Sequence, residues 1–423
     1  MPWPPALPTL KEPLLGSEKP GRGAPGRACK LSLTLGLTLC CAWPSLRVAH
    51  PATPLHEDLD APQPAAPPLF HIDASSPFDA GLQHGRLARS RIAGWFGTAE
   101  MRKVFAFTQS ANGSAALARL REDNAREFPA YAEELDGIAE GSGFSSDWIW
   151  SANLLNELGS LMGAQGFQAP PEHCSDVYAV APRGFAQGFS HGHNDDWSAA
   201  AKPFWYLTSY TYRNASAVGF RACAGVTYPA TLVGWAPTWN PSGMYATQNS
   251  MVPRASRAGG LACAFVQRRA VCASSSLEEM VRALTVPGWS DGASMNIVDL
   301  RGRRMANVEL WEDSSSVFEI TDAIGNYTHF NEYKHLTLEG GGSIDDPRVF
   351  ARDPRQDQAD TMAPPRSVAD VKAVLSDSKI FRPDATLMTL VLDGSTGQLD
   401  VWSATPSSLS SPVFSWNLLT FFD

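Results

Sequence analysis

The chain has 423 residues and a net charge of −9, and its composition of 44% apolar and 18% charged residues is typical of a globular protein with a real core. The acidic balance gives no basic footprint for nucleic acid, so no nucleic-acid partner is expected. Seven cysteines are too few for a disulfide scaffold of this length, and no Cys-x-x-Cys pair indicates a structural zinc site.

Residues 1–49 have the features of a targeting segment. A Pro-rich, basic stretch (1–30) precedes an apolar run (31–43) that has the length of a signal-peptide core and is short for a membrane span. We expect a signal peptide or a signal anchor, with a plastid transit segment as the weaker alternative. The chain should therefore enter the secretory pathway as a secreted, lysosomal, vacuolar or lumenal protein. Contact with a membrane is expected only if residues 31–43 are retained as an anchor.

A Pro/Ala-rich linker (50–69) follows and is not expected to fold by itself. The folded part then begins near residue 70. Three Asn-x-Ser/Thr sequons beyond this point fit a lumenal or secreted domain and are predicted glycosylation sites: Asn112, Asn214 and Asn326.

The first part of the folded region, about residues 70–165, is predicted to be helical. A helix begins after Ser76, which is suited to the N-cap, with Asp79 where a capping box places an acid. A second helical stretch covers about 114–127, breaks at a proline, and resumes as far as Gly141, a candidate C-cap glycine. Apolar residues recur at helical spacing along both stretches.

The pattern changes to strands after residue 174. An aromatic, β-branched stretch (203–213) predicts a strand, and two longer stretches (294–311 and 386–402) predict hairpins. Two short helices, each beginning at a serine, are expected at 276–284 and 367–375. A helical first part followed by a strand-rich remainder predicts an α+β fold with stacked layers and not an alternating βαβ chain.

Three candidate active sites fall within residues 172–197. The first is a Gly-x-Ser-x-Gly pattern around Ser190. A serine nucleophile needs an apolar strand before it and a helix after it, so that the hydroxyl sits on a strained turn. Neither flank of Ser190 fits, and we interpret the pattern as a strand end or a turn without chemistry.

The second candidate is a group of four polar residues that could hold zinc or iron: His191, His193, Asp195 and Asp196. Histidines two apart on a strand point to the same face, and a nearby carboxylate could complete such a site. A polar turn explains the group without a further ligand. We therefore expect neither a metal nor an organic cofactor.

The third candidate is Cys174, at the point where the helical region gives way to strands. A half-buried thiol or half of a disulfide is the simplest interpretation. A nucleophile released at a new chain terminus would need the same placement, because its own α-amine then acts as the base. An α-amine titrates at about 7.7–8.0 and a thiol at about 8.5, so proton transfer between them is nearly balanced.

Five segments, in order, resemble the cysteine N-terminal-nucleophile hydrolases related to acyl-coenzyme A:isopenicillin-N acyltransferase. More distant relatives are the choloylglycine hydrolases and acid ceramidase. The resemblance extends from about residue 70 to 405, and its segments are 75–85, 125–143, 174–197, 239–251 and 328–333. Each motif alone is weak, and their common order makes the resemblance specific.

The resemblance implies a four-layer αββα sandwich of antiparallel sheets and a precursor that cleaves itself between His173 and Cys174. Residues 70–173 would form a helical pro-segment and residues 174–423 the catalytic chain, which remain together as an α/β heterodimer or a higher oligomer. Cys174 would then attack a carbonyl, with Asp196 orienting its α-amine. The resemblance also implies Asn331 as a catalytic residue that stabilises the developing oxyanion or holds the amine. Three further residues are implied as oxyanion or substrate contacts: Asn249, His193 and Asn194.

Two positions depart from the pattern of the family. His173 stands where the acyltransferases have glycine, which puts the rate of cleavage in doubt. His193 stands where distant relatives have arginine, so the polar contact to the substrate is expected to differ. With Cys174 as nucleophile, three thiols outside the leader allow one disulfide in three pairings, and the choice among them stays open: Cys223, Cys263 and Cys272.

The expected activity is therefore hydrolysis of the amide bond of a small N-acyl substrate through an acyl-enzyme on Cys174. Its Cys-Ser-Asp and His-Asn-Asp-Asp sequences resemble the branch that hydrolyses β-alanyl conjugates of amines. Coenzyme A-dependent acyl transfer of the penicillin acyltransferase type is one alternative. A glycoprotein that keeps the fold without processing or catalysis is the other.

Overall fold

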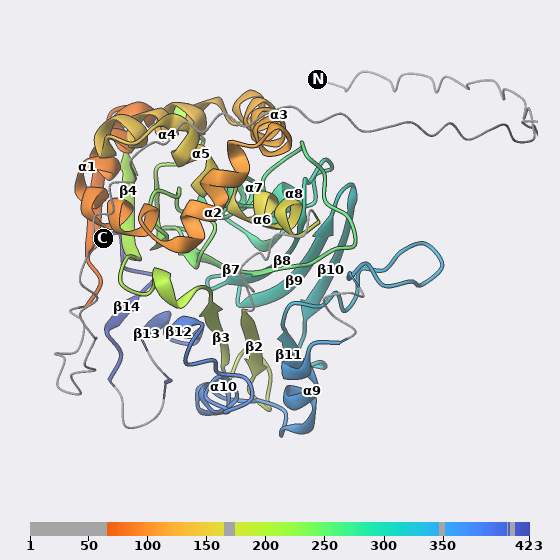
Figure 1. The fold of residues 1–423 in the computed structure, drawn as a ribbon. Coiled ribbons are helices and arrows are strands. Elements are labelled where there is room, and N and C mark those ends of the chain that lie inside the picture. Colours follow the sequence, from red (N-terminus) through yellow and green to blue (C-terminus); the bar gives the residue numbers. More distant parts are fainter. Residues whose placement is uncertain (1–65, 165–173, 347–351, 404, 407–410) are drawn as a thin grey trace, which may run out of the picture. The chain divides into compact units, whose positions relative to one another are not determined.

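The computed structural model describes residues 66–164, 174–346, 352–403, 405–406 and 411–423 (Figure 1). The predicted targeting segment, most of the linker and the cleavage-site residue His173 lie outside the described residues. Within these ranges, no helix is both long enough and apolar enough to cross a membrane.

In the described residues before Cys174 the chain forms six helices, as the sequence predicted for this region: α1 (Pro77–Phe96), α2 (Ala99–Thr108), α3 (Ala111–Glu127), α4 (Pro129–Ser142), α5 (Ser146–Asn153) and α6 (Leu155–Ala164). Ser76 caps α1 and accepts a hydrogen bond from the backbone N–H of Asp79 at 3.1 Å. The Asp79 carboxylate reaches back to the backbone N–H of Ser75 at 2.9 Å, one residue earlier than a capping box requires. The local sequence therefore fixes where this helix begins.

The predicted end of α4 at Gly141 is wrong. The cap is Gly143, which adopts the left-handed conformation with φ of +79° and donates its N–H to the carbonyl of Ala139. Gly141 instead lies inside the helix against α1, where an added Cβ would come within 2.3 Å of the Leu82 carbonyl oxygen. Its missing side chain permits close helix packing and does not end the helix.

Fourteen strands of the described chain form two sheets. The eight-stranded sheet has the order β1 (Leu69–Ala74), β4 (Tyr206–Tyr212), β5 (Ala222–Thr227), β6 (Thr238–Trp239), β7 (Met244–Ser250), β8 (Gly292–Asp299), β9 (Arg304–Trp311), β10 (Ser314–Ile320). The six-stranded sheet has the order β11 (Asn326–His329), β2 (Ser175–Val180), β3 (Phe189–Asp196), β12 (Thr386–Asp393), β13 (Gln398–Trp402), β14 (Phe414–Asn417). Both predicted hairpins, β8–β9 and β12–β13, are confirmed.

The two sheets face one another between layers of helices, which confirms the predicted αββα sandwich (Figure 1). The helices α7 (Cys263–Ala273) and α8 (Leu277–Leu284) pack on the eight-stranded sheet, and α10 (Val368–Leu375) packs on β2, β3 and β12. Between the sheets, the Tyr178 hydroxyl of β2 donates to Asn296 of β8 at 2.9 Å. The layer between the sheets therefore includes a buried polar contact between β2 and β8.

Several elements were not predicted. β1 lies in the region expected to be helical and pairs with β4 in parallel, in a sheet whose other neighbours are antiparallel. The helices α7 and α9 (Pro354–Thr361) were also missed. Strand β1 depends on its pairing with β4, more than a hundred residues away, and local periodicity carries no information about such a partner.

Of the three disulfide pairings left open, the fold contains Cys223–Cys272, which joins β5 to α7. Cys263 and Cys174 are free thiols, and both are buried. Cys174 is thus not half of a disulfide.

Candidate active site

The β2–β3 hairpin builds the candidate site. Its strands pair in antiparallel register with Ser175 opposite Asn194 and Asp176 opposite His193. Cys174 directly precedes β2, so this register brings it to the end of β3, and its sulfur lies 3.9 Å from the backbone carbonyl oxygen of Asp196. Residues 22 positions apart in sequence therefore meet because of the hairpin alone.

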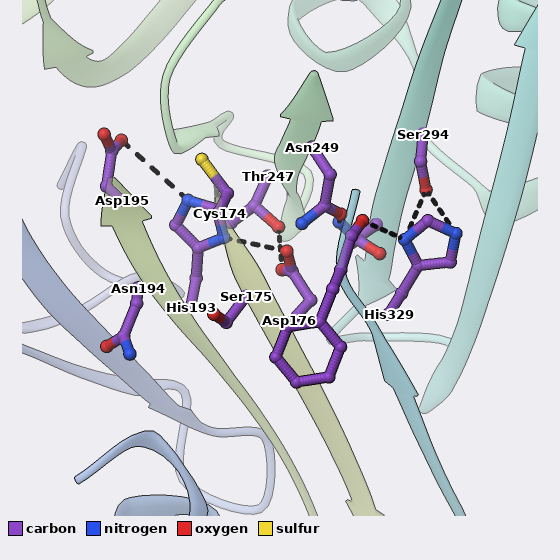
Figure 2. A network of polar contacts seen from close by, with 12 residues as sticks. Cys174, Ser175, Asp176, His193, Asn194, Asp195, Thr247, Asn249, Ser294 and His329 are labelled. Carbon is purple, nitrogen blue, oxygen red and sulfur yellow. Dashed lines mark hydrogen bonds and ion pairs between the residues drawn. The ribbon is translucent and has the colours of Figure 1, made fainter. Parts of the chain in front are cut away.

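Strand alternation sorts the side chains of β3 into two faces. His191 and His193 point toward the eight-stranded sheet and both approach the Asp176 carboxylate, at 3.0 Å and 2.9 Å respectively. Asn194 points the other way, donating to the Leu375 carbonyl of α10 at 3.0 Å and accepting from Thr389 at 2.6 Å. Its amide is thus committed to packing between the sheet and α10, away from Cys174 (Figure 2).

Asp176 is the centre of a buried charged cluster. Its carboxylate accepts a hydrogen bond from Thr247 of β7 and pairs with His193 Nδ1, and neither Asp176 nor His193 is more than 1% exposed (Figure 2). Asp176 holds the pKa of His193 well above its ordinary value, despite the opposing effect of burial. His193 in turn keeps the pKa of Asp176 well below its usual range. His193 and Asp176 thus shift the pKa of one another in the directions that favour their charged forms.

The Cys174 thiol lies beside the ring of His193, and both residues line a pocket (Figure 2). Burial raises the pKa of this thiol to about 11, and His193 opposes that effect. One wall is aromatic, with the ring centres of Trp197 and Tyr228 4.4 Å apart. The complete lining is Cys174, His193, Asp195, Asp196, Trp197, Tyr228, Trp235, Gln248 and Ser250.

Asp196 lies beside Cys174 in a network that includes Arg355 of α9. Its carboxylate accepts from the Thr386 hydroxyl at 2.5 Å and lies 3.4 Å from Arg355 Nη1. Burial raises the pKa of Asp196 to about 7, with the Arg355 charge opposing the rise. Arg355 also donates to the Cys174 carbonyl oxygen at 3.3 Å and to the Asn331 side chain at 2.6 Å. Arg355 thus links Asp196, Cys174 and Asn331.

The two asparagines expected near an oxyanion occupy different positions. Asn331, just after β11, donates to the backbone carbonyl of the pocket residue Ser250 at 2.6 Å. Asn249 of β7 lies between the sheets, where its Oδ1 accepts from Asn296 at 2.7 Å. Its Nδ2 is buried and has no hydrogen-bond partner among the described residues. Asn249 thus keeps a free amide donor on the strand that also carries Thr247.

Sequence reasoning missed Arg355, Asp176 and the aromatic wall. Arg355 sits in a charged stretch without a distinguishing spacing. Asp176 was visible beside Cys174, and its role appears only when the β2–β3 register places it opposite His193. A signal did exist, since His193 and Asp176 lie on facing strands of a short hairpin, where cross-strand pairs contact each other.

Part of the chain is similar to a known protein family. Residues 187–352 match the family described as acyl-coenzyme A:6-aminopenicillanic acid acyl-transferase. The matched segment covers less than half of the chain, and over this segment the chain is similar to that family. The match includes His193, Asp196, Asn249 and Asn331, while Cys174 precedes it. The match confirms the predicted resemblance and supports an N-terminal-nucleophile cysteine hydrolase or acyltransferase that acts on amides.

No curated protein matches the chain. Among solved structures, a Caenorhabditis elegans N-acylethanolamine-hydrolyzing acid amidase ortholog is similar at 12% identity, with a TM-score of 0.38. The similarity covers 58% of this chain and 99% of that chain.

Proposed function

We propose that the protein is a self-processing cysteine amidohydrolase that cleaves small N-acyl substrates through an acyl-enzyme on Cys174. The observation that carries this proposal is the position of Cys174: a free thiol that lines a pocket at the start of β2, beside the Asp196 carboxylate. Cleavage before Cys174 would free an α-amine at this place. Asp196 would orient that amine as the base, and the ammonium form would lower the pKa of Asp196 again.

The pocket favours substrates with an amine and an apolar group. Two carboxylates, Asp195 and Asp196, line it together with aromatic rings. An ammonium group is attracted both by a carboxylate and by the face of an aromatic ring. β-Alanyl conjugates of amines carry such an ammonium, and we propose them as the first substrates to test.

Coenzyme A-dependent transfer is the second candidate, favoured by the description of the matched family. Of the described residues that line the pocket, none is Lys or Arg, so the lining offers the phosphates of coenzyme A no opposite charge. Hydrolysis is therefore our first choice.

Processing would leave two associated fragments. Residues on both sides of Cys174 contribute to one continuous hydrophobic core, including Trp95 and Leu135 before it and Trp239 and Leu310 after it. Secretory-pathway entry would expose the sequons to glycosylation, and Asn112 and Asn214 are exposed whereas Asn326 is half-buried on β11.

The test is the intact mass and N-terminal sequence of the purified full chain after prolonged incubation, combined with hydrolysis of β-alanyl amines, N-acyl amino acids and penicillins. Fragments that begin at Cys174, together with amide hydrolysis, are the expected result. Cys174→Ala should abolish both, because no other group supplies the attacking sulfur. Cys263→Ala, at the other free buried thiol, is the matched control and should keep both. A chain that stays uncut and hydrolyses none of these compounds contradicts the proposal.

A further inference from the structure

A buried carboxylate on β9, that of Glu309, binds the chain on both sides of the segment 330–333. His329, the last residue of β11, donates from Nε2 to this carboxylate at 2.8 Å. The carboxylate also accepts hydrogen bonds at 2.6, 2.9 and 2.5 Å from three successive backbone N–H groups, those of Lys334, His335 and Leu336. One side chain thus fixes the chain before the segment and directly after it.

The contacts of His329 fix the orientation of its ring. His329 Nδ1 donates to the Phe330 carbonyl oxygen at 2.7 Å, and the Ser294 hydroxyl lies 3.2 and 3.3 Å from the two ring nitrogens (Figure 2). Burial acts to raise the pKa of Glu309, but its interactions with His329, His335 and the backbone lower that pKa to about 2. The carboxylate is therefore ionised at neutral pH and can accept all four hydrogen bonds.

Asn331 lies within the segment 330–333 and joins two parts of the candidate site. Its buried amide donates to the Ser250 carbonyl oxygen at 2.6 Å and accepts from Arg355 at 2.6 Å. Ser250 lines the pocket, and Arg355 donates to the carbonyl oxygen of Cys174 at 3.3 Å. The position of Asn331 therefore relates a wall of the pocket to the backbone of the proposed nucleophile.

We propose that Glu309 is a positioning residue of the candidate active site, because it holds the chain on both sides of the segment 330–333 and so sets the place of Asn331 relative to Cys174. This inference rests on the proposed function for the identity of the reaction. It goes beyond that function because Glu309 is not among the described residues that line the pocket. A displacement of about 1 Å in a positioned group can lower a rate by about 100-fold.

The proposed role requires both oxygens of the Glu309 carboxylate. Oε1 accepts from His329 and Lys334, and Oε2 accepts from His335 and Leu336. A glutamine side chain has the same length, but it offers one accepting oxygen and an NH₂ group that can only donate. Glu309→Gln therefore leaves two of the four donors facing a group that cannot accept them, and the segment should lose one of its attachments.

A double-mutant cycle with Asn331 tests the proposal in the purified full chain. Steady-state kinetics on an amide that the wild type cleaves compares the wild type, Glu309→Gln, Asn331→Ala and the double variant. We expect Glu309→Gln to lower kcat by about tenfold or more, with KM within about twofold, because positioning acts in the transition state. In the Asn331→Ala background the same substitution should change kcat by less than about twofold, because the group that Glu309 positions is already absent.

Two further variants complete the cycle. Asp299→Asn is the matched control, because the buried Asp299 carboxylate accepts the backbone N–H groups of Gly302 at 2.6 Å and Leu277 at 3.3 Å, at the turn of the same β8–β9 hairpin. It should leave kcat of the folded molecules within about twofold. His329→Gln weakens the attachment before the segment and keeps the test decisive if Glu309→Gln does not fold. Its smaller loss of kcat should also disappear in the Asn331→Ala background.

Hydrogen–deuterium exchange measures the attachment of the segment without any substrate. Peptides that cover residues 330–336 should exchange about tenfold faster or more in Glu309→Gln than in the wild type, and at the wild-type rate in Asp299→Asn. Unchanged exchange in Glu309→Gln would overturn the proposal, and so would a loss of kcat that is equally large with and without Asn331. Faster exchange in Glu309→Gln, in a protein whose wild type hydrolyses no amide, would support the attachment and count against the proposed function alone.

Discussion

Two of the buried charged clusters in the described part of the chain have different consequences. In the helical cluster, Glu134 of α4 pairs with Arg268 of α7 at 2.8 Å and accepts from the Tyr212 hydroxyl at 2.7 Å. Aromatic rings enclose it, with the Arg268 guanidinium 4.8 Å from the ring centre of Tyr131. In the hairpin cluster, Asp176 and His193 are equally buried. His193, however, lines the same pocket as the Cys174 thiol.

This comparison teaches that burial of charge does not by itself mark an active site. Both clusters join segments that are distant in sequence, and both need their opposite charge to be stable in the interior. Only the hairpin cluster places a titratable group against a reactive atom. The helical cluster joins α4, before Cys174, to α7, after it, and so contributes to holding the two proposed fragments together.

The largest expected effect comes from breaking the helical cluster. Glu134→Ala leaves the Arg268 charge buried without its partner, which should lower the free energy of unfolding by about 3–5 kcal/mol. Urea denaturation measures this loss. The control is Glu127→Ala, which breaks the partly exposed pair with Arg269 and should cost about 1 kcal/mol or less. Equal losses in the two variants would mean that the buried pair contributes no more to the free energy of unfolding than the partly exposed pair.

The parts of the fold that local chemistry encodes were predictable. Ser76 caps its helix as predicted, and its side chain accepts the backbone N–H three residues on. Ser276 and Ser367, where the two short helices were predicted to start, cap these helices in the same way. The parallel pairing of β1 with β4 was not predictable, since the register between distant strands is set by packing. The prediction that Gly141 ends α4 was wrong because the sequence does not distinguish a glycine at a helix contact from a glycine at a helix end.

The hairpin cluster can be tested on its chemistry through Asn249. Asn249→Ala removes the free Nδ2 donor that we propose for the oxyanion, and should lower kcat/KM by about 10²–10³-fold. Steady-state kinetics on a cleaved amide checks this. Asn307→Ala is the matched control, a buried amide of the same network that bonds Asn296 and Ser294. It should lose stability while each folded molecule keeps its activity.

A similar fall in kcat/KM for both variants would indicate that Asn249 acts only through the stability of the network. Such a result would leave Asn331, which bonds the pocket residue Ser250, as the remaining asparagine for the oxyanion.

The sequence predicted several residues of the candidate site, but not the hydrogen bonds and ion pairs that join them. Spacing and resemblance selected Cys174, Asp196 and His193, and these three line one pocket. Asn194 was selected for the same reasons, yet strand alternation turns it toward α10. Arg355 was missed because its partners come from β3 and from the segment after β11, which only the tertiary fold brings together.

The smallest effect on stability and kcat is expected for a substitution of Ser190. This substitution tests whether only the face of β3 that carries His191 and His193 takes part in the chemistry. It lies inside the strand, paired with Ala179 and Asp393, and not on the strained turn that a serine nucleophile requires. Ser190 lies on the same face of β3 as Gly192. This face is turned toward α10, because a Cβ added at Gly192 would come within 2.4 Å of Val371. The Ser190 hydroxyl is buried without a hydrogen-bond partner among the described residues. Ser190→Ala should therefore change the free energy of unfolding by about 0.5 kcal/mol or less and leave kcat within about twofold. A large loss of kcat in a stably folded variant would return the nucleophile to the serine and remove the distinction between the two faces.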